Sequence, residues 1–91
     1  MKATLYKHDG TSMSVRPANG KSFSLAELQG FVGGYIESID LNDGSVMVVN
    51  EDGKLCGLPL NTQATDILRS SYKGTTDFIV GDVLICKPNN L

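Results

Sequence analysis

The chain has 91 residues and a formal net charge of −2, with 41% hydrophobic and 20% charged residues. These values are ordinary for a soluble globular protein, and we expect a single domain over residues 1–91. The eight Lys and Arg residues are scattered singly. A nucleic-acid interface needs converging cations, so we expect no nucleic-acid partner. No apolar run approaches the ~20 residues that span a bilayer, and the start does not resemble a signal peptide, so we expect a cytoplasmic protein without a membrane partner.

The chain begins with a predicted hairpin. Asp-Gly suits a two-residue type I′ turn, which is the strongest short-range hairpin signal. Three such pairs occur, at Asp9-Gly10, Asp43-Gly44 and Asp52-Gly53. The first pair predicts a hairpin between residues 3–7 and 12–16. His8 lies beside this turn, and we interpret it as a solvated turn residue.

The first helix has complete start and stop signals. Ser24 is the predicted N-cap and Glu27, three residues later, completes a capping box. Phe23 and Leu28 form the matching hydrophobic staple. Gly33-Gly34 predicts the end of the helix, because glycine accepts the left-handed conformation there.

A three-stranded meander is predicted next, and its turns set the register. The predicted strands are Tyr35–Leu41, Ser45–Asn50 and Lys54–Leu60. Two-residue turns would pair Leu41 with Val46, Ile39 with Val48, Glu37 with Asn50, Asn50 with Leu55, and Val49 with Cys56. This register places Glu37 and Asn50 on one face. Both faces of the central strand are apolar, so we expect it to be covered on both sides.

The last third of the chain predicts a second helix and a bent strand. Asn61 caps the helix from Thr62 to about Ser71. Its buried stripe would contain Ala64, Ile67, Leu68 and Tyr72. The final strand is Phe78–Cys86, with a bulge or bend at Gly81-Asp82, and the tail Lys87–Leu91 is expected to fray.

These elements predict an α+β fold. Its sheet would be strongly bent and antiparallel, or a small partial barrel, with five to six strands and two short helices. Cys56 and Cys86 lie in apolar strand patterns, so we interpret them as reduced core thiols, with a structural disulfide as the alternative. One His and two distant Cys give no metal spacing, and we expect neither a metal nor a cofactor.

A small polar site is predicted around the second hairpin. Glu37 lies on an otherwise apolar face and needs a partner, and the amide of Asn50 would lie across from it. If the second helix folds back, a pocket with one aromatic wall results. Its predicted ligand-binding residues are Tyr35, Glu37, Asn50, Asn61, Thr62 and Thr65. The alternative is structural: Glu37 and Asn50 only fix the register, and Asn61 only caps its helix.

No catalytic residue is predicted with comparable support. His8 and the two Cys residues lack an obvious partner for nucleophilic catalysis. Residues 30–34 are rich in glycine, but they end a helix instead of opening one, which is the wrong order for a phosphate cradle. Glu37 with Asp82 is the one carboxylate pair that could act in acid–base catalysis.

Four sequence blocks resemble a family of small proteins of unknown function. The blocks are Gly33-Gly34-Tyr35-Ile36-Glu37, then Val48 to Leu55, then Gly57 to Asn61 with Ala64-Thr65, and finally Ile79 to Leu84. They occur in order within residues 23–86. The family is encoded mainly by phages, prophages and plasmids, and this chain most resembles copies from gut Bacteroides-type phages. The resemblance implies a short accessory gene of mobile elements, active in the host cell cytoplasm if phage-encoded, with no established activity.

We therefore expect a binding protein and not an enzyme. The first version is counter-defence, in which a small oligomer sequesters a nucleotide signal made by host immunity. The second is a protein-binding inhibitor or adaptor of a host or phage protein, for example a CRISPR inhibitor. Its surface would include exposed apolar residues such as Tyr6, Met13, Phe31 or Tyr72. A homo-oligomer is expected if the small sheet borrows cover from a second copy.

Overall fold

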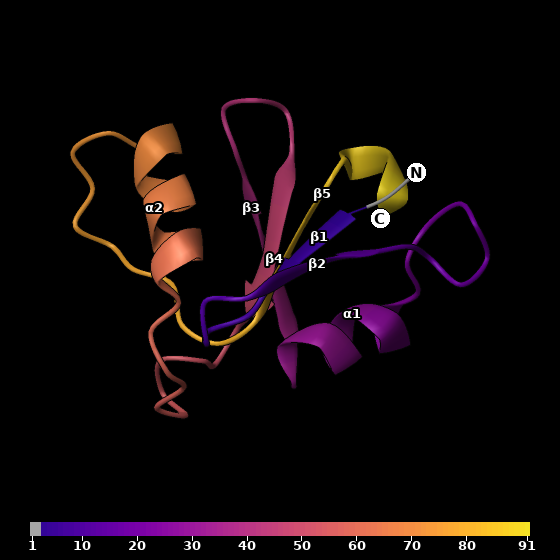
Figure 1. Ribbon diagram of the computed structural model, residues 1–91, viewed down its shortest axis with the longest axis horizontal. Coiled ribbons are helices and arrows are strands. Elements are labelled where there is room, and N and C mark those ends of the chain that lie inside the picture. The colour runs from indigo at the N-terminus through magenta and orange to yellow at the C-terminus, as the bar shows by residue number, and fades with distance from the viewer. Residues whose placement is uncertain (1–2) are drawn as a thin grey trace.

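The computed structural model describes residues 3–91 and shows an open, five-stranded antiparallel sheet with two α-helices. The strands are β1 Ala3–Tyr6, β2 Ser12–Val15, β3 Ile36–Asp40, β4 Val46–Asn50 and β5 Val83–Cys86. The helices are α1 Leu25–Val32, α2 Thr62–Ser71 and a 3₁₀-helix η1 Pro88–Asn90. The strand order is β2-β1-β5-β4-β3 (Figure 1), which confirms the α+β class. None of the described helices is long and apolar enough to cross a membrane.

The two helices cover opposite faces of the sheet. On one face, Leu28 and Val32 of α1 pack in a cluster that includes Val48 and Leu84. On the other face, α2 contributes to a cluster that includes Met47 and Val83. The central strands β4 and β5 are therefore covered on both sides, as the apolar pattern of β4 predicts. Each fully buried aliphatic side chain of this kind stabilises the fold by about 1.5–3 kcal/mol.

The β3–β4 turn differs from the predicted two-residue turn, and the register changes with it. Gly44 N donates to the Leu41 carbonyl and Leu41 N donates to Ser45 O, so the loop holds three residues. Gly44 has a φ of 87°, whereas Asp43 keeps a negative φ and accepts a bond from Ser45 N at 2.9 Å. This is a type I turn followed by a left-handed glycine, which adds one residue to the loop.

The predicted pairs in this hairpin are consequently wrong by one residue. The observed partners are Ile36 with Asn50, Glu37 with Val49, Ser38 with Val48, Ile39 with Met47, and Asp40 with Val46. Because side chains alternate along a strand, this slip moves the side chains of one strand to the other face relative to its neighbour. Glu37 and Asn50 therefore lie on opposite faces, and the prediction that they face each other is wrong.

The predicted third strand of the meander does not form. Residues 51–57 make successive turns, in which Gly53 N donates to Asn50 O and Cys56 N donates to Asp52 O. The predicted pairs of Asn50 with Leu55 and of Val49 with Cys56 are therefore absent. The Asn50 side chain also accepts a bond from Asp52 N at 2.9 Å, which turns the chain away from β4.

The free side of β4 is taken by β5 instead. Val46 pairs with Cys86 and Val48 pairs with Leu84, and β5 also pairs with β1. The chain reaches this position after the predicted bend, where Gly81 has a φ of 75°. Of the predicted strand Phe78–Cys86, the part before the bend contributes only an isolated bridge between Val80 and Leu60. An all-apolar segment can occupy a central position because both of its faces are buried.

Helix α1 follows the sequence signals. The Ser24 side chain accepts a bond from Glu27 N at 3.1 Å, and the Glu27 carboxylate accepts a bond from Ser24 N at 2.9 Å. This is the predicted capping box. Phe23 and Leu28 are both buried in the core on the α1 side. The helix ends at Gly33, which has a φ of 81° and donates to Gln29 O.

Helix α2 depends on Asn61, whose side chain bonds three backbone groups. Its Oδ1 accepts from Ala64 N at 3.0 Å, and its Nδ2 donates to Tyr6 O at 2.9 Å and to Gly81 O at 2.8 Å. The residue is 1% exposed. The predicted cap is confirmed, and the same side chain also joins α2 to β1 and to the bend before β5.

The buried stripe of α2 is shifted from the prediction. Ala64 and Leu68 are buried, and Ile67 is half-buried as its place at the edge of the stripe allows. Thr65 is buried instead of Tyr72, whose hydroxyl donates to the backbone carbonyl of Asp40. Tyr72 therefore lies at the rim between α2 and β3.

The C-terminal tail is ordered, so the prediction that Lys87–Leu91 frays is wrong. Asn90 is 1% exposed, and its carbonyl accepts a bond from Phe23 N at 2.6 Å. This bond attaches η1 to the segment that leads into α1. Both cysteines are free, and the predicted buried position is confirmed for Cys86 but wrong for Cys56, which is exposed on the turns. Burial raises the pKa of the Cys86 thiol.

We expect Asn61→Ala to lower the free energy of unfolding by about 3 kcal/mol, because it leaves buried backbone groups without partners. Thr62→Ala changes an exposed neighbour and should cost less than about 0.5 kcal/mol. Urea denaturation of the two variants tests this difference. Equal losses of stability would contradict the role given to the Asn61 side chain.

We also expect two of the three Asp-Gly turns, those of Asp9 and Asp43, to make stability fall in acid. The hydroxyl and the backbone N–H of Thr11 lower the pKa of Asp9, and those of Ser45 lower the pKa of Asp43, both from an ordinary value of 3.8. Because these pKa values are lower in the folded state, the stabilisation is present above about pH 4 and is lost as the pH falls through the folded-state values.

The control for this prediction is the double variant Asp9→Asn with Asp43→Asn, which keeps an acceptor oxygen but cannot titrate. Its stability should depend less on pH than that of the parent chain when urea denaturation is measured from about pH 6 to about pH 2. The same acid dependence in both proteins would exclude these two carboxylates as its source.

Candidate functional site

The six residues predicted to bind a ligand do not converge on one site. Glu37 and Asn50 line one hollow, Thr62 and Thr65 line another, and Tyr35 and Asn61 line neither. Asn61 and Thr65 are buried, and their polar atoms bond the backbone: Thr65 Oγ1 accepts from Ile79 N at 2.9 Å and donates to Ile79 O at 3.3 Å. Thr62 is exposed at the start of α2. Tyr35 is 69% exposed and precedes β3. Tyr35 lines none of the hollows beside the other five residues, so it does not supply the predicted aromatic wall.

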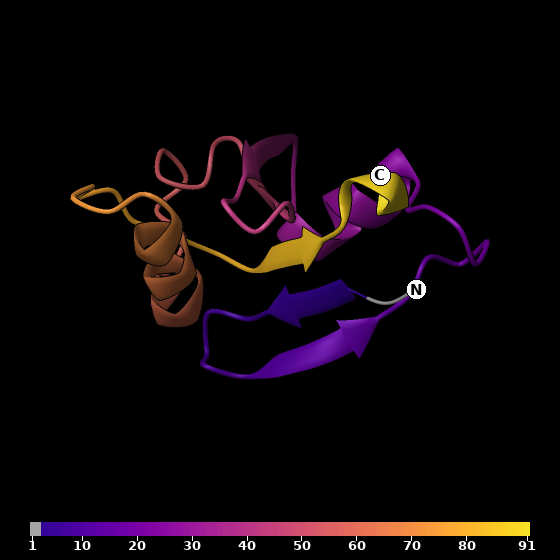
Figure 2. The ribbon, with the colours of Figure 1, turned by 90° about the horizontal axis from the view of Figure 1, so that it is seen from above.

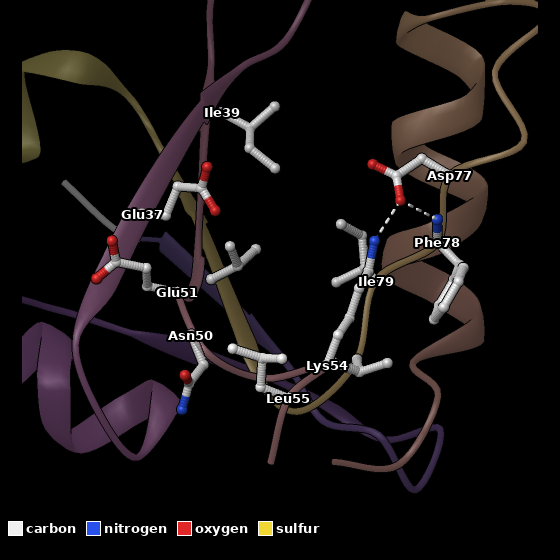
Figure 3. A pocket seen from close by; sticks show the side chains of 11 residues that line it. Glu37, Ile39, Asn50, Glu51, Lys54, Leu55, Asp77, Phe78 and Ile79 are labelled. Atoms are coloured by element: carbon white, nitrogen blue, oxygen red, sulfur yellow. Dashed lines mark hydrogen bonds and ion pairs between the residues drawn. The ribbon is translucent and has the colours of Figure 1, made fainter. Parts of the chain in front are cut away.

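The Asn50 side chain bonds backbone groups and so helps to hold the fold together. Its Nδ2 donates to the Val32 carbonyl at 3.2 Å, on the α1 side of the sheet. Gly34 lies directly against this amide, since a Cβ there would meet Asn50 Nδ2 at 2.9 Å. Figure 3 shows the amide directed away from Glu37. Asn50 therefore joins the end of α1 to the turn after β4.

Glu37 borders a groove on the α2 side of β3. The groove consists of two adjoining hollows that share Glu37, Ile39 and Asp77, and we call it the β3 groove. Their volumes are about 180 Å³ and about 400 Å³. Tyr72 lines the larger hollow, and Glu51 and the 54–55 turn line the smaller one (Figure 3).

The polar lining of the β3 groove is acidic. It carries the carboxylates of Glu37, Glu51 and Asp77 and a single ammonium group, that of Lys54. Lys54 is already engaged, because it forms an ion pair with Asp77 and lies 4.4 Å from the centre of the Phe78 ring. Within residues 3–91, no side chain pairs with Glu37 or Glu51. The groove therefore has a net negative charge. The Glu37 carboxylate points into it, and the Glu51 carboxylate lies at its rim and points outward (Figure 3).

Of the three carboxylates of the groove, that of Asp77 is held most firmly by neighbouring groups. The Lys54 ammonium and the Phe78 N–H, which donates at 2.8 Å, lower the pKa of Asp77. Arg69 Nε donates to the Asp77 carbonyl at 3.0 Å and so holds this segment against α2. Asp77 is therefore anionic at neutral pH and serves mainly to anchor the wall of the groove.

The backbone of β3 is unpaired along its outer edge. Leu41 N bonds Ser45 O at one end of the hairpin, and Glu51 N bonds Tyr35 O at the other. Hydrogen-bonded pairs alternate in an antiparallel ladder, so the N–H and C=O groups of Ile36, Ser38 and Asp40 face outward. The Tyr72 hydroxyl bonds the Asp40 carbonyl, as this alternation requires. Among the described residues, no other group bonds this edge.

The carboxylate pair considered for catalysis is not brought together. Glu37 borders the β3 groove, whereas Asp82 lines a separate hollow with His8. Asp82 Oδ1 accepts a bond from His8 N at 2.9 Å, which fastens the first turn to the bend before β5. Within residues 3–91, no group of three or more His, Cys, Asp or Glu side chains is placed to hold a metal ion.

Sequence reasoning identified Glu37 but missed most of the β3 groove. Lys54 and Asp77 are 23 positions apart in the sequence. They meet only because residues 51–57 form turns and not a strand. The one available signal was that polar residues occur on both faces of β3, with Glu37 on one face and Ser38 and Asp40 on the other. It indicates an edge strand, because both of its faces carry polar positions.

The comparisons with known proteins define the family. Residues 1–90 match the family described as Domain of unknown function (DUF3846). No curated protein matches the chain, and no solved structure does. The family match confirms that the chain resembles a family of small domains of unknown function. With nearly the whole sequence matched, the chain belongs to the DUF3846 family.

Proposed function

We propose that this chain is a small binding protein whose β3 groove takes an extended, basic segment of a partner protein. The observation that carries the proposal is the open edge of β3 beside two unpaired carboxylates, Glu37 and Glu51. A strand that adds to an open edge gains main-chain hydrogen bonds, and pockets beside the edge select its alternate side chains. The unpaired edge of β3 and the two hollows beside it support this binding mode.

The groove suggests which side chains the segment carries. Alternate residues of an added strand lie on the same face of the sheet, about 7 Å apart. On the α2 side, one such residue would lie beside Glu37 and the next beside Ile39 and Tyr72. A Lys or Arg suits the first position, and an apolar residue suits the second, where the larger hollow lies.

The same charges argue against the nucleotide version of the binding hypothesis. A nucleotide phosphate would meet two carboxylates that no cation neutralises, and like charges repel at short range. The ring of Tyr35 is also not on the groove to stack on a base. We therefore favour the protein-binding inhibitor or adaptor over sequestration of a nucleotide immune signal.

The biological setting remains part of the proposal. The resemblance of four sequence blocks to phage, prophage and plasmid proteins supports a mobile-element gene that acts in the host cytoplasm. In that setting, a basic segment of a host defence protein or of another phage protein would be the target. We propose a role without catalysis, because Glu37 and Asp82 line separate hollows.

The proposal predicts that ten-residue peptides with alternating Lys and apolar residues bind, whereas the same peptides with Glu in place of Lys do not. Glu37→Lys should weaken binding about tenfold by placing a cation opposite a cation. Asp66→Lys changes an exposed carboxylate on α2 and should leave the affinity unchanged. Fluorescence anisotropy with labelled peptides measures all three proteins.

Two results would contradict the proposal. One is equal binding of the Lys and Glu peptides, which would show that the groove carboxylates do not select the ligand. The other is binding of cyclic or ADP-ribose-type nucleotides in native mass spectrometry, with loss of that binding in Glu37→Ala. The second result would restore the nucleotide hypothesis in place of the peptide one.

A further inference from the structure

The strand β2 forms the second open edge of the sheet. Lys7 N donates to Thr11 O, and β1 pairs with β2 from Tyr6 with Ser12 to Ala3 with Val15. The alternation of hydrogen-bonded pairs therefore turns the N–H and C=O groups of Ser12 and Ser14 outward. Figure 2 shows β2 as the outermost strand, with no other segment beyond it.

This edge lacks the usual protection against strand pairing. Edge strands are normally shielded by charged side chains, proline or a bulge. Residues 12–15 contain only Ser, Met and Val, and their ladder with β1 has no bulge. Met13 is 51% exposed on the α1 side of the sheet, where its neighbour across the ladder is the buried Leu5. An apolar side chain is thus held at the rim of the core beside unpaired backbone groups.

We propose that a second copy of this chain pairs with β2 in an antiparallel, two-fold symmetric manner. Centring the pair on Met13 places Ser12 of each copy opposite Ser14 of the other. Both residues face outward, so this register forms two hydrogen-bonded pairs, with four N–H···O bonds. The two Met13 residues then form the close, non-hydrogen-bonded pair on the axis and cover each other.

Charges at the two ends of β2 support a second copy of the chain as the partner of this edge. In the proposed register, Arg16 of one copy lies across from Gly10 of the other, next to Asp9. The Thr11 hydroxyl and N–H keep the pKa of Asp9 low, so this carboxylate is anionic at neutral pH. Each dimer therefore brings two cations beside two anions, which favours the symmetric pair.

The charges along β3 are not complementary to those of a second β3 edge. Its exposed charges are the carboxylates of Glu37 and Asp40, and Tyr72 already bonds the Asp40 carbonyl. Two copies that paired through β3 would bring carboxylates together without a cation. The β2 edge is therefore the self-complementary one, and this inference does not depend on the peptide proposed for β3.

The dimer should be moderate in strength, because pairing four residues buries less area than a standard interface. We expect a dissociation constant of about 1–100 µM. Sedimentation velocity from about 5 to about 500 µM of the full chain should show a shift from monomer to dimer. A monomer at every concentration would overturn the proposal.

Proline substitutions at the two edges test whether dimerisation depends on β2 in particular or on any change to the sheet. Ser14→Pro removes an N–H that the monomer leaves unpaired, and proline is tolerated at such edge positions. It removes two hydrogen bonds from the dimer, so we expect dimerisation to weaken at least about tenfold. Ser38→Pro makes the matched change at β3 and should leave the dimer intact. Equal effects of the two variants would overturn the assignment to β2.

A cross-link tests the register independently of any loss of folding. In a Cys56→Ser background, Met13→Cys should form a disulfide between copies under mild oxidation. Non-hydrogen-bonded partners lie about 4.5 Å apart at Cα, which is within disulfide range. Ser38→Cys in the same background is the control and should remain monomeric on a non-reducing gel. Cross-linking of the control but not of Met13→Cys would overturn the proposed axis.

Discussion

The loop from Leu41 to Ser45 fixes the register of β3 against β4, and this register decides which side chains border the groove. A left-handed glycine that follows a type I turn adds one residue to the loop. Since successive side chains point to opposite faces, that one residue places Glu37 with Val49 and Met47 on the α2 side and directs Asn50 to α1. The acidic groove and the attachment of α1 both follow from this single local geometry.

Asn61 connects this hairpin sheet to the rest of the chain. Its side chain is almost fully buried and bonds α2, β1 and the bend before β5 at once. An amide suits this position because it offers both donors and an acceptor without a charge to desolvate. The cap of one helix is thus also the junction at which β5 is directed between β1 and β4. This placement covers β4 on its free side and leaves β2 and β3 as the two edges.

The features that the sequence predicted correctly are local ones. The capping box of Ser24 and Glu27, the stop at Gly33 and the cap at Asn61 each depend on residues within one or two turns of the chain. The strand at residues 54–60 was wrong because Gly53 and Asn50 close a turn whose bonds compete with pairing. The insertion of β5 was missed for a different reason: it pairs with β4 about forty positions away and with β1 about eighty positions away, and hairpin signals carry no information about such pairs. Both errors affected the prediction of the groove. Lys54 and Asp77 form their ion pair only because residues 51–57 make turns and because β5 lies next to β4.

The two edges of the sheet differ in their side chains, and for this reason we propose a different partner for each. Every edge strand offers unpaired backbone groups, so the backbone alone cannot distinguish a second copy from a foreign segment. The side chains and turns around each edge make the distinction. At β3, we propose that carboxylates without a free cation disfavour a second copy and favour a basic segment. At β2, uncharged residues lie between an Asp-containing turn and an arginine, and antiparallel symmetry brings those opposite charges together. A dimer formed through β2 would leave both β3 edges free at its outer ends, so self-association and partner binding are compatible in one molecule.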